Sequence, residues 1–204
     1  MKNRRGDFMS NKGGSATEVE LIVTDAKGNL IKIHKQKSET LLMNFIRFIE
    51  RILLTGNPVI DALEPAASVT ISDMQFNNTS AVAPANVDSW GIQIGRSSSP
   101  NGITTFQLGD KISHGTGSGQ MIYNACSSEE ASGTFPTMRI KISRTFTNQS
   151  GGDITVREIG LVISLVRANG IDTVKFMIAR DVLTSAITVP NGANLTVNYY
   201  VKIN

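Results

Sequence analysis

From Ala66 onward the chain is a succession of short runs rich in β-branched and other apolar residues, each ended by turn residues. This punctuation constrains the fold more than any other feature of the sequence. Asn-Gly pairs at 101–102, 169–170 and 191–192 suit tight turns. We predict strands at residues 68–76, 90–95, 120–125, 137–148, 154–165, 173–182 and 195–203. Many short strands and one helix predict a mainly β fold: an antiparallel β-sandwich, Ig-like or jelly-roll-like, with one N-terminal α-helix.

The helix is predicted over residues 38–57, with Ser38 as its N-cap and with Gly56 and Pro58 ending it. A surface helix needs only about a third of its circumference to be apolar, and this one has far more. It should therefore be covered on two sides, by the sheet and by either a neighbouring subunit or a loop of the same chain. Its polar positions form one narrow stripe that is not rich in lysine, which argues against a helix lying on a membrane: Thr40, Asn44, Arg47 and Arg51.

Three regions follow from these patterns. Residues 1–16 are polar, basic and aperiodic, and are predicted to form a flexible arm. Residues 17–57 hold a β-hairpin with its turn at 25–29 and then the apolar helix, and are predicted to be an assembly or docking element packed on the sandwich. Residues 58–204 are predicted to form the sandwich itself. The predicted interface with other copies or partners consists of apolar helix positions: Leu41, Leu42, Phe45, Phe48, Ile49 and Ile52.

Charge and cysteine content limit the function classes. The net charge is +3, but the basic runs contain no interleaved aromatic residues, so nucleic-acid binding is not favoured. The single cysteine, Cys126, excludes an internal disulfide and fits a reducing compartment. No apolar run reaches the roughly 20 residues of a membrane span. We expect a soluble protein made in the cytoplasm, without a membrane partner.

The stretch 144–164 reads as part of a hairpin that carries charged residues on its apolar face. If the turn is centred on Gly151, Arg144 lies opposite Glu158, while Arg157 points the other way. A catalytic interpretation of Arg144 and Glu158 needs a cleft and a second acid or base. A structural ion pair needs only that two half-buried charges meet, so we predict the structural pair. The second strand changes phase near Gly160, which predicts either a bulge there or burial of both faces.

Other patterns that resemble functional motifs are incomplete. The stretch HGTGSGQ at 114–120 lacks the Gly-Lys-Ser/Thr end of a phosphate loop, and a strand follows it where a helix would be needed. His34 and His114 have no further ligands at metal-site spacing. Cys126 has no histidine near it in sequence, and Glu129 and Glu130 lie in a polar stretch. We therefore predict no catalytic residues, no metal and no cofactor.

Three stretches resemble the structural proteins of tailed-bacteriophage virions. They are GIQIGRSSSPNGITTFQLGDKISHGTGSGQMIY, ISRTFTNQSGGDITVREIGLVI and FMIARDVLTSAITVPNGANLTVNYYVKI, and together they lie within residues 90–203. The resemblance implies a non-enzymatic component of the tail, neck, fibre or capsid surface. The apolar helix and basic arm near the N-terminus depart from the family pattern, which leaves the position in the particle open.

We therefore predict a virion protein of the tail or neck (head–tail) assembly that associates with itself as a ring or bundle and binds neighbouring virion proteins. A capsid decoration or head-fibre protein is the first alternative. A receptor- or carbohydrate-binding module of a tail fibre is the second, although Trp90 is the only tryptophan available as an aromatic platform. A β-fold glycosidase is a further rival and would need two carboxylates converging in a cleft.

Overall fold

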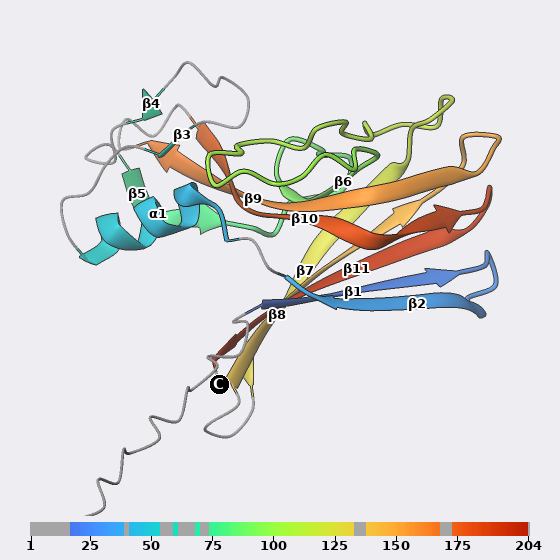
Figure 1. Ribbon diagram of the computed structural model, residues 1–204, viewed down its shortest axis with the longest axis horizontal. Coiled ribbons are helices and arrows are strands. Elements are labelled where there is room, and N and C mark those ends of the chain that lie inside the picture. Colours follow the sequence, from blue (N-terminus) through green and yellow to red (C-terminus); the bar gives the residue numbers. More distant parts are fainter. Residues whose placement is uncertain are drawn as a thin grey trace, which may run out of the picture.

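The computed structural model describes residues 17–38, 41–53, 59–60, 68–69, 74–132, 138–167 and 173–203. Two antiparallel sheets pack face to face, so the predicted mainly β sandwich is confirmed (Figure 1). The first sheet has five strands in the order β2 (Leu30–Lys37), β1 (Thr17–Thr24), β11 (Asn194–Ile203), β8 (Met138–Thr147) and β7 (Ile122–Ser132).

The second sheet is built on β9, which pairs with β10 along one edge. Along its other edge β9 pairs with two shorter strands in succession. These elements are β9 (Ile154–Arg167), β10 (Thr173–Val189), β5 (Met74–Ser80) and β6 (Gly91–Gly95). The helix α1 (Met43–Leu53) lies at one end of this sheet, near the small pair β3 (Val59–Ile60) and β4 (Ser68–Val69) (Figure 1).

The core lies between the two sheets and follows the alternation of side chains along the strands. On β1 the residues Val19, Leu21 and Val23 are buried and point to the second sheet. Tyr123 on β7 meets Phe146 on β8 edge to face, with ring centroids 4.7 Å apart. Burial of each such side chain contributes roughly 1.5–3 kcal/mol, so this interior supplies most of the free energy that favours folding.

The predicted hairpin between residues 138–148 and 154–165 is wrong. Both stretches are strands, β8 and β9, but β8 pairs with β7 and β11, whereas β9 pairs with β10, β5 and β6. The chain crosses from one sheet to the other between them. Gly151 has a φ of +84°, which glycine adopts readily. A turn with this conformation can belong to a hairpin or to a crossing between sheets.

Asn148 ties together the two places where the chain crosses between the sheets. It is fully buried after β8, and its Nδ2 donates to the carbonyl oxygens of Gly152 and Val189, each at 2.8 Å. Its Oδ1 accepts from the backbone N–H and the hydroxyl of Ser150. Its own backbone joins residues 192 and 193 before β11. One amide side chain therefore fixes both connections at this end of the sandwich.

Strand β9 is buried on both faces in its second half, where every residue from 158 to 165 is buried. This confirms the second explanation for the phase change. The β9–β10 pairing also shifts register twice, between Met177 and Ala179 and between Val182 and Ile187, with the additional residues on β10. The segment between β6 and β7 lies on the side of β9 that faces away from the five-stranded sheet (Figure 1). There Leu108 packs with Val162 and Met177, so a long connection completes the second layer.

The predicted N-terminal hairpin is confirmed as β1 and β2. Asp25 forms its turn by accepting the backbone N–H groups of Lys27 and Asn29 at 2.8 Å. β1 pairs over its whole length with β11, so the hairpin supplies two strands of the sandwich and is not an element packed on it. The predicted flexible arm, residues 1–16, lies outside the described residues.

The predicted helix is present but begins five residues later than expected. Ser38 is not its N-cap, because its Oγ donates to Asp181 Oδ2 at 2.8 Å. Leu41 forms a bridge with Ala179, and the Leu42 N–H donates to the Ile178 carbonyl, so these residues are extended before α1 starts at Met43. Within the described residues, none of the helical structure has the length and hydropathy needed to cross a membrane.

Candidate functional site

Arg144 is buried in a cage of carbonyl oxygens. Only 1% of its surface is exposed, and all of its N–H groups donate to main-chain oxygens. The guanidinium carbon lies 4.6 Å from the centroid of the Tyr123 ring, which adds a cation–π contact. Burial lowers the pKa of this guanidinium. The acceptors are the carbonyl oxygens of Pro84, Val87, Trp90, Ile92 and Asn124.

Glu158 is fully buried and its partner is Arg180 on β10. Arg180 Nε donates to Glu158 Oε2 at 2.7 Å, and Nη2 lies 2.7 Å from the same oxygen. The carboxylate also accepts backbone N–H groups of the long β6–β7 connection: those of Ser97, Gly109 and Asp110 at 3.1, 3.1 and 2.8 Å. The ion pair therefore holds this connection against the outer face of β9.

The predicted ion pair between Arg144 and Glu158 is wrong, because their strands belong to different sheets. The residue directly opposite Arg144 is Val197 on β11, and the residue opposite Glu158 on β10 is Val182. Both residues nevertheless hold segments of their own chain, as a structural role requires. Sequence reasoning missed Arg180 as the partner, although a charged residue inside the apolar run FMIARDVL is a signal that could have found it.

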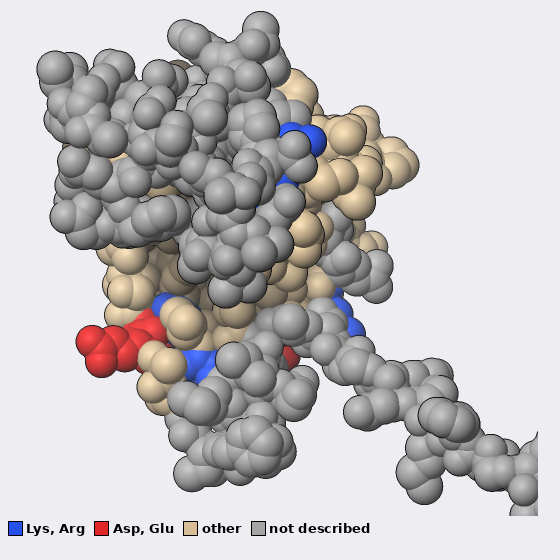
Figure 2. Space-filling model, turned by 90° about the vertical axis from the view of Figure 1, so that its left-hand side faces the viewer, with Lys and Arg blue, Asp and Glu red and all other residues tan. Residues whose placement is uncertain are grey.

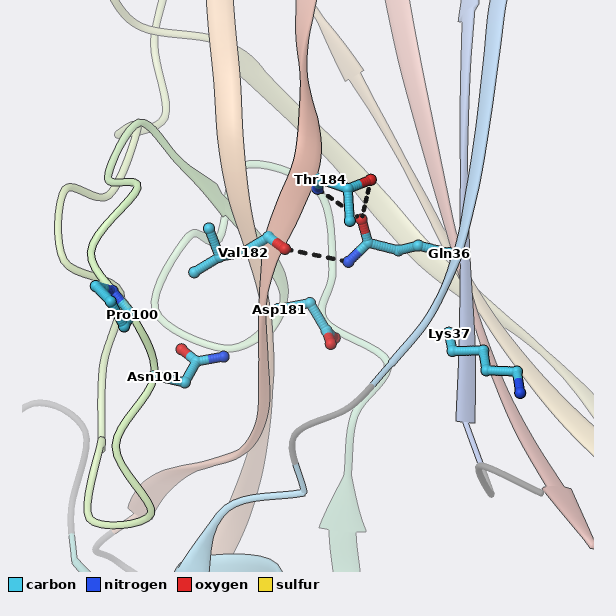
Figure 3. Close-up of a pocket in the computed structure, with 7 residues that line it drawn as sticks. All are labelled: Gln36, Lys37, Pro100, Asn101, Asp181, Val182 and Thr184. Atoms are coloured by element: carbon cyan, nitrogen blue, oxygen red, sulfur yellow. Dashed lines mark hydrogen bonds between the residues drawn. The ribbon is translucent and has the colours of Figure 1, made fainter. Parts of the chain in front are cut away.

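A cavity of about 600 Å³ lies beside β10, where Gln36 and Lys37 of β2 approach it from one side. Figure 3 shows Pro100 and Asn101 on the other side of the β10 ribbon. The remaining lining residues come from β10 itself: Asp181, Val182 and Thr184.

The amide side chains of Gln36 and Asn101 at this cavity are engaged by the chain itself. Gln36 Nε2 donates to the Val182 carbonyl at 3.2 Å, and its Oε1 accepts the Thr184 N–H at 3.0 Å (Figure 3). Asn101 Nδ2 donates to the Arg180 carbonyl at 2.7 Å. These hydrogen bonds link β2, β10 and the β6–β7 connection. They have a structural role at the wall of the cavity.

Asp181 is the buried acid at this cavity, with 3% of its surface exposed. It accepts the hydroxyl groups of Ser38 and Tyr199 at 2.8 and 2.9 Å. Burial, together with the adjacent carboxylate, raises the pKa of Tyr199 well above its ordinary value, so the phenol stays protonated and donates. Asp181 thereby links β10 to β11 of the other sheet and to the segment before α1.

The predicted interface on the helix is only partly available for a partner. Leu42 is fully buried in its own chain, so its assignment to the interface is wrong. Leu41 and Phe45 are partly buried against the main core. Ile49 is 36% exposed. The side chains of two further predicted positions, Phe48 and Ile52, lie outside the described residues.

Exposed apolar side chains also lie on β2, which sequence reasoning did not assign to an interface. Leu30, Ile31 and Ile33 are 59%, 50% and 47% exposed. On α1, Ile46 is 56% exposed. The signal in the sequence was the unusual composition of the strand LIKIHKQK, whose isoleucines alternate with charged or polar residues on a strand at the edge of a sheet.

The outer face of the five-stranded sheet carries a polar network centred on Glu20. Lys35 Nζ lies 2.7 Å from Glu20 Oε1, and Oε2 accepts from Asn198 Nδ2 at 2.9 Å and from the Tyr200 hydroxyl at 3.2 Å. The hydrogen bond from Lys35 is the main reason that the pKa of Glu20 is lowered. Lys141 on β8 pairs with Glu129 on the neighbouring strand at 2.7 Å.

Viewed from the left-hand side of Figure 1, the described surface shows acidic atoms projecting at the lower left with Lys and Arg atoms close to them (Figure 2). The charged groups of the outer sheet face pair across neighbouring strands, as at Lys35–Glu20 and Lys141–Glu129. Such pairs contribute roughly 0.2–1 kcal/mol each and fix the register of the strands.

In the part of the chain that the structure describes, no three His, Cys, Asp or Glu residues form a group that could hold a metal ion. His114 Nδ1 accepts the backbone N–H of Tyr123 at 3.2 Å. Cys126 is buried on β7.

Comparisons of the chain with models of protein families, with curated proteins and with solved structures find no match in any of the three.

Proposed function

We propose that this chain is a non-catalytic building block that works by associating with copies of itself and with neighbouring structural proteins. The particle that we propose for it is the virion of a tailed bacteriophage, with the tail or neck as its place. The place in the virion rests on the sequence resemblance alone. The building-block role has separate support in the distribution of apolar and charged side chains.

The observation that carries the proposal is the apolar surface of β2. Leu30, Ile31 and Ile33 expose about half of their surface each, at 59%, 50% and 47%, on a strand at the edge of a sheet. An exposed apolar strand at a sheet edge promotes association with other chains, because its main-chain groups can pair with another strand and its apolar side chains are in contact with water. A protein whose role is to assemble uses such an edge.

The buried charges support the same proposal. An enzyme of the glycosidase type needs carboxylates that reach a substrate. Glu158 is instead enclosed by Arg180 and by backbone N–H groups, and Asp181, at the cavity beside β10, is 3% exposed and accepts the hydroxyl groups of Ser38 and Tyr199. These acids hold segments together that are distant along the chain.

The stretches that resemble virion proteins carry the polar residues on which the sandwich depends. Arg144, Asn148 and Glu158 lie in the second stretch, and Arg180 and Asp181 lie in the third. Each is buried, and each joins segments that are far apart along the chain. The resemblance therefore falls on residues that maintain a fold, as expected for a structural component.

The test is the mass of the full chain in solution as a function of concentration, measured by light scattering or sedimentation. We expect oligomers, and we expect the paired substitution Ile31→Ser and Ile33→Ser to weaken association. Ile103→Ser is the matched control, because Ile103 is 64% exposed on a connection away from β2. A chain that stays monomeric up to high concentration, without binding a neighbouring virion protein, would contradict the proposal.

A further inference from the structure

The five-stranded sheet has two open edges, formed by β2 and β7. The first part of β7 is covered, since the Cys126 N–H donates to the Ala83 carbonyl and the Asn86 N–H donates to the Tyr123 carbonyl. Beyond that, every residue from 127 to 132 is exposed, as are most residues of β2. Each edge therefore presents main-chain groups to which another strand can be added.

The two edges carry opposite charge. β2 has the sequence LIKIHKQK, with Lys32, Lys35 and Lys37 and no acidic residue. β7 has the sequence IYNACSSEEAS, with Glu129 and Glu130 and no basic residue. The edges are thus complementary to each other, and neither is complementary to itself.

The charges across the outer face of the sheet alternate in sign from one edge to the other. The strand registers place Lys37, Glu18, Tyr200, Lys141 and Glu129 side by side, in that order from β2 to β7. If the β2 edge of a second copy is placed beyond Glu129, a lysine follows the glutamate and the alternation continues. Opposite charges on adjacent strands are favourable, and like charges are unfavourable.

Symmetric edge pairing is disfavoured by the same charges. Two β2 strands facing each other would bring lysines together, and two β7 strands would bring glutamates together. Pairing of unlike edges is a head-to-tail contact, which builds a closed ring or a filament. Each strand of this sheet is antiparallel to its neighbour, so β2 and β7 run in the same direction. The joined edges of two similarly oriented copies would therefore be parallel strands.

From this geometry we infer that copies of the chain join edge to edge, with the basic β2 edge of one copy against the acidic β7 edge of the next, so that their five-stranded sheets become continuous. The inference rests on the proposed function, since it specifies how the building block associates.

Charge reversal tests the inference at two residues that have no ion pair within the described chain, Lys37 and Glu130. We expect Lys37→Glu or Glu130→Lys alone to weaken self-association about tenfold, because each replaces an attraction by a repulsion at the contact. An equimolar mixture of the two variants should associate like the wild type, since every contact then has complementary edges. Lys27→Glu, in the β1–β2 turn, makes the same charge change away from both edges and should have no effect.

Thermal unfolding of each variant separates loss of association from loss of folding, and recovery in the mixture requires folded chains. A second measurement uses Lys37→Cys and Glu130→Cys in a Cys126→Ala background with a short bismaleimide. Cross-linked dimers are expected only when the two variants are mixed. Dimers formed by either variant alone would show symmetric pairing and overturn the inference.

The outcomes separate the inference from the proposed function. If the wild type associates and both charge-reversed variants associate equally well, the edge contact is wrong while the building-block role stands. If the wild type neither self-associates nor binds a neighbouring virion protein, the proposed function itself fails.

Discussion

The guanidinium of Arg144 keeps its positive charge inside the protein without a carboxylate partner among the described residues. Its N–H groups meet the partial negative charges of main-chain carbonyl oxygens, and the face of the Tyr123 ring adds to them. The carbonyls belong to segments before β6, within it and on β7. The Arg144 side chain therefore holds these three segments together. Arginine suits this position because its five donors have fixed directions.

Replacement of Arg144 by lysine should therefore be costly although it preserves the charge. An ammonium group has three N–H donors on one atom and cannot reach acceptors spread around a planar guanidinium. We expect Arg144→Lys to lower the free energy of unfolding by about 2–4 kcal/mol, measured by chemical denaturation. Arg157→Lys, at an exposed position on β9, is the control and should change it by less than about 0.5 kcal/mol.

Glu158 neutralises Arg180 and holds the β6–β7 connection. Glu158→Gln keeps the shape but leaves Arg180 without its counter-charge, so we expect a loss of about 3–5 kcal/mol in the free energy of unfolding. Hydrogen exchange should also become faster at the amides of Gly109 and Asp110, which donate to this carboxylate. Unchanged exchange there would mean that other contacts hold the connection in place.

Glu20 gives the sandwich a dependence on acid. Its pKa is lowered, chiefly by the hydrogen bond from Lys35, so its contribution to stability is present above its ordinary value of 4.5 and is lost as pH falls through the lowered folded-state pKa. We expect Glu20→Gln to lower the free energy of unfolding by about 1 kcal/mol at pH 7. The difference from wild type should shrink below about pH 4.5, which denaturation at pH 7 and at pH 3 would measure. A difference that is the same at both pH values would contradict this role.

At the residue scale, sequence reasoning recognised Arg144 and Glu158 as structural but paired them wrongly. A charged residue within an apolar run is visible in the sequence, and it signals a buried polar group that needs partners. The partners themselves come from distant segments: main-chain carbonyls for one, and Arg180 for the other. Main-chain acceptors leave no pattern in side-chain sequence, so the carbonyl cage around Arg144 could not have been predicted.

At the scale of elements, the strands were largely predictable and their partners were not. Residues 154–165 and 195–203 were expected to be strands and are, as β9 and β11. The turn at Gly151 has the residues of a hairpin, yet the chain crosses there to the other sheet. Local turn chemistry is similar in the two cases. Burial of both faces of β9 was the better indicator that it lies inside a layered structure.

Asn148 is the residue that distinguishes a crossing from a hairpin at this place. We expect Asn148→Ala to lower the free energy of unfolding by about 2–3 kcal/mol, because the buried Val189 carbonyl loses this side-chain donor and the Gly152 carbonyl keeps only the Ser150 hydroxyl. Gln149→Ala, at the exposed neighbouring position, is the control. If the two variants unfold at the same denaturant concentration, Asn148 does not tie the two connections together.

The helix illustrates how tertiary contacts override a local signal. Ser38 has the character of an N-cap, but Asp181 engages its hydroxyl, and Leu42 continues as extended chain against Ile178. The outer surface of the helix then differs from the predicted polar stripe: Asn44 is buried at 3% exposure and Ile46 is exposed at 56%. The extended residues Leu41 and Leu42, fixed against β10, decide which face of the helix is turned to the core.

At the scale of the whole molecule, the sandwich class followed from the sequence because alternation and turns recur along most of the chain. The surface through which copies would meet did not follow, because the sequence directed attention to the helix. The predicted interface residues included none on the strand β2. Its position at the edge of the sheet, opposite to an acidic edge, depends on the order β2-β1-β11-β8-β7, which strand patterns alone do not specify.

Association through oppositely charged edges should respond to salt. We expect the dissociation constant of the oligomer to rise about five- to tenfold between 0.05 M and 0.5 M NaCl, since exposed charges are screened over a few ångströms at the higher concentration. A contact made by apolar surface alone would keep its affinity or gain some. Sedimentation at the two salt concentrations distinguishes these results.

Thr17 at the start of β1 lies opposite Val201 near the end of β11, in an antiparallel pair. A mechanical load pulling on residues 17 and 203 would therefore peel the hydrogen bonds apart one after another, as a zip opens, and would meet little resistance. A force applied at the two edge strands of the sheet would instead load all the hydrogen bonds between neighbouring strands at the same time. A module built in this way bears tension sideways far better than through its polymer ends.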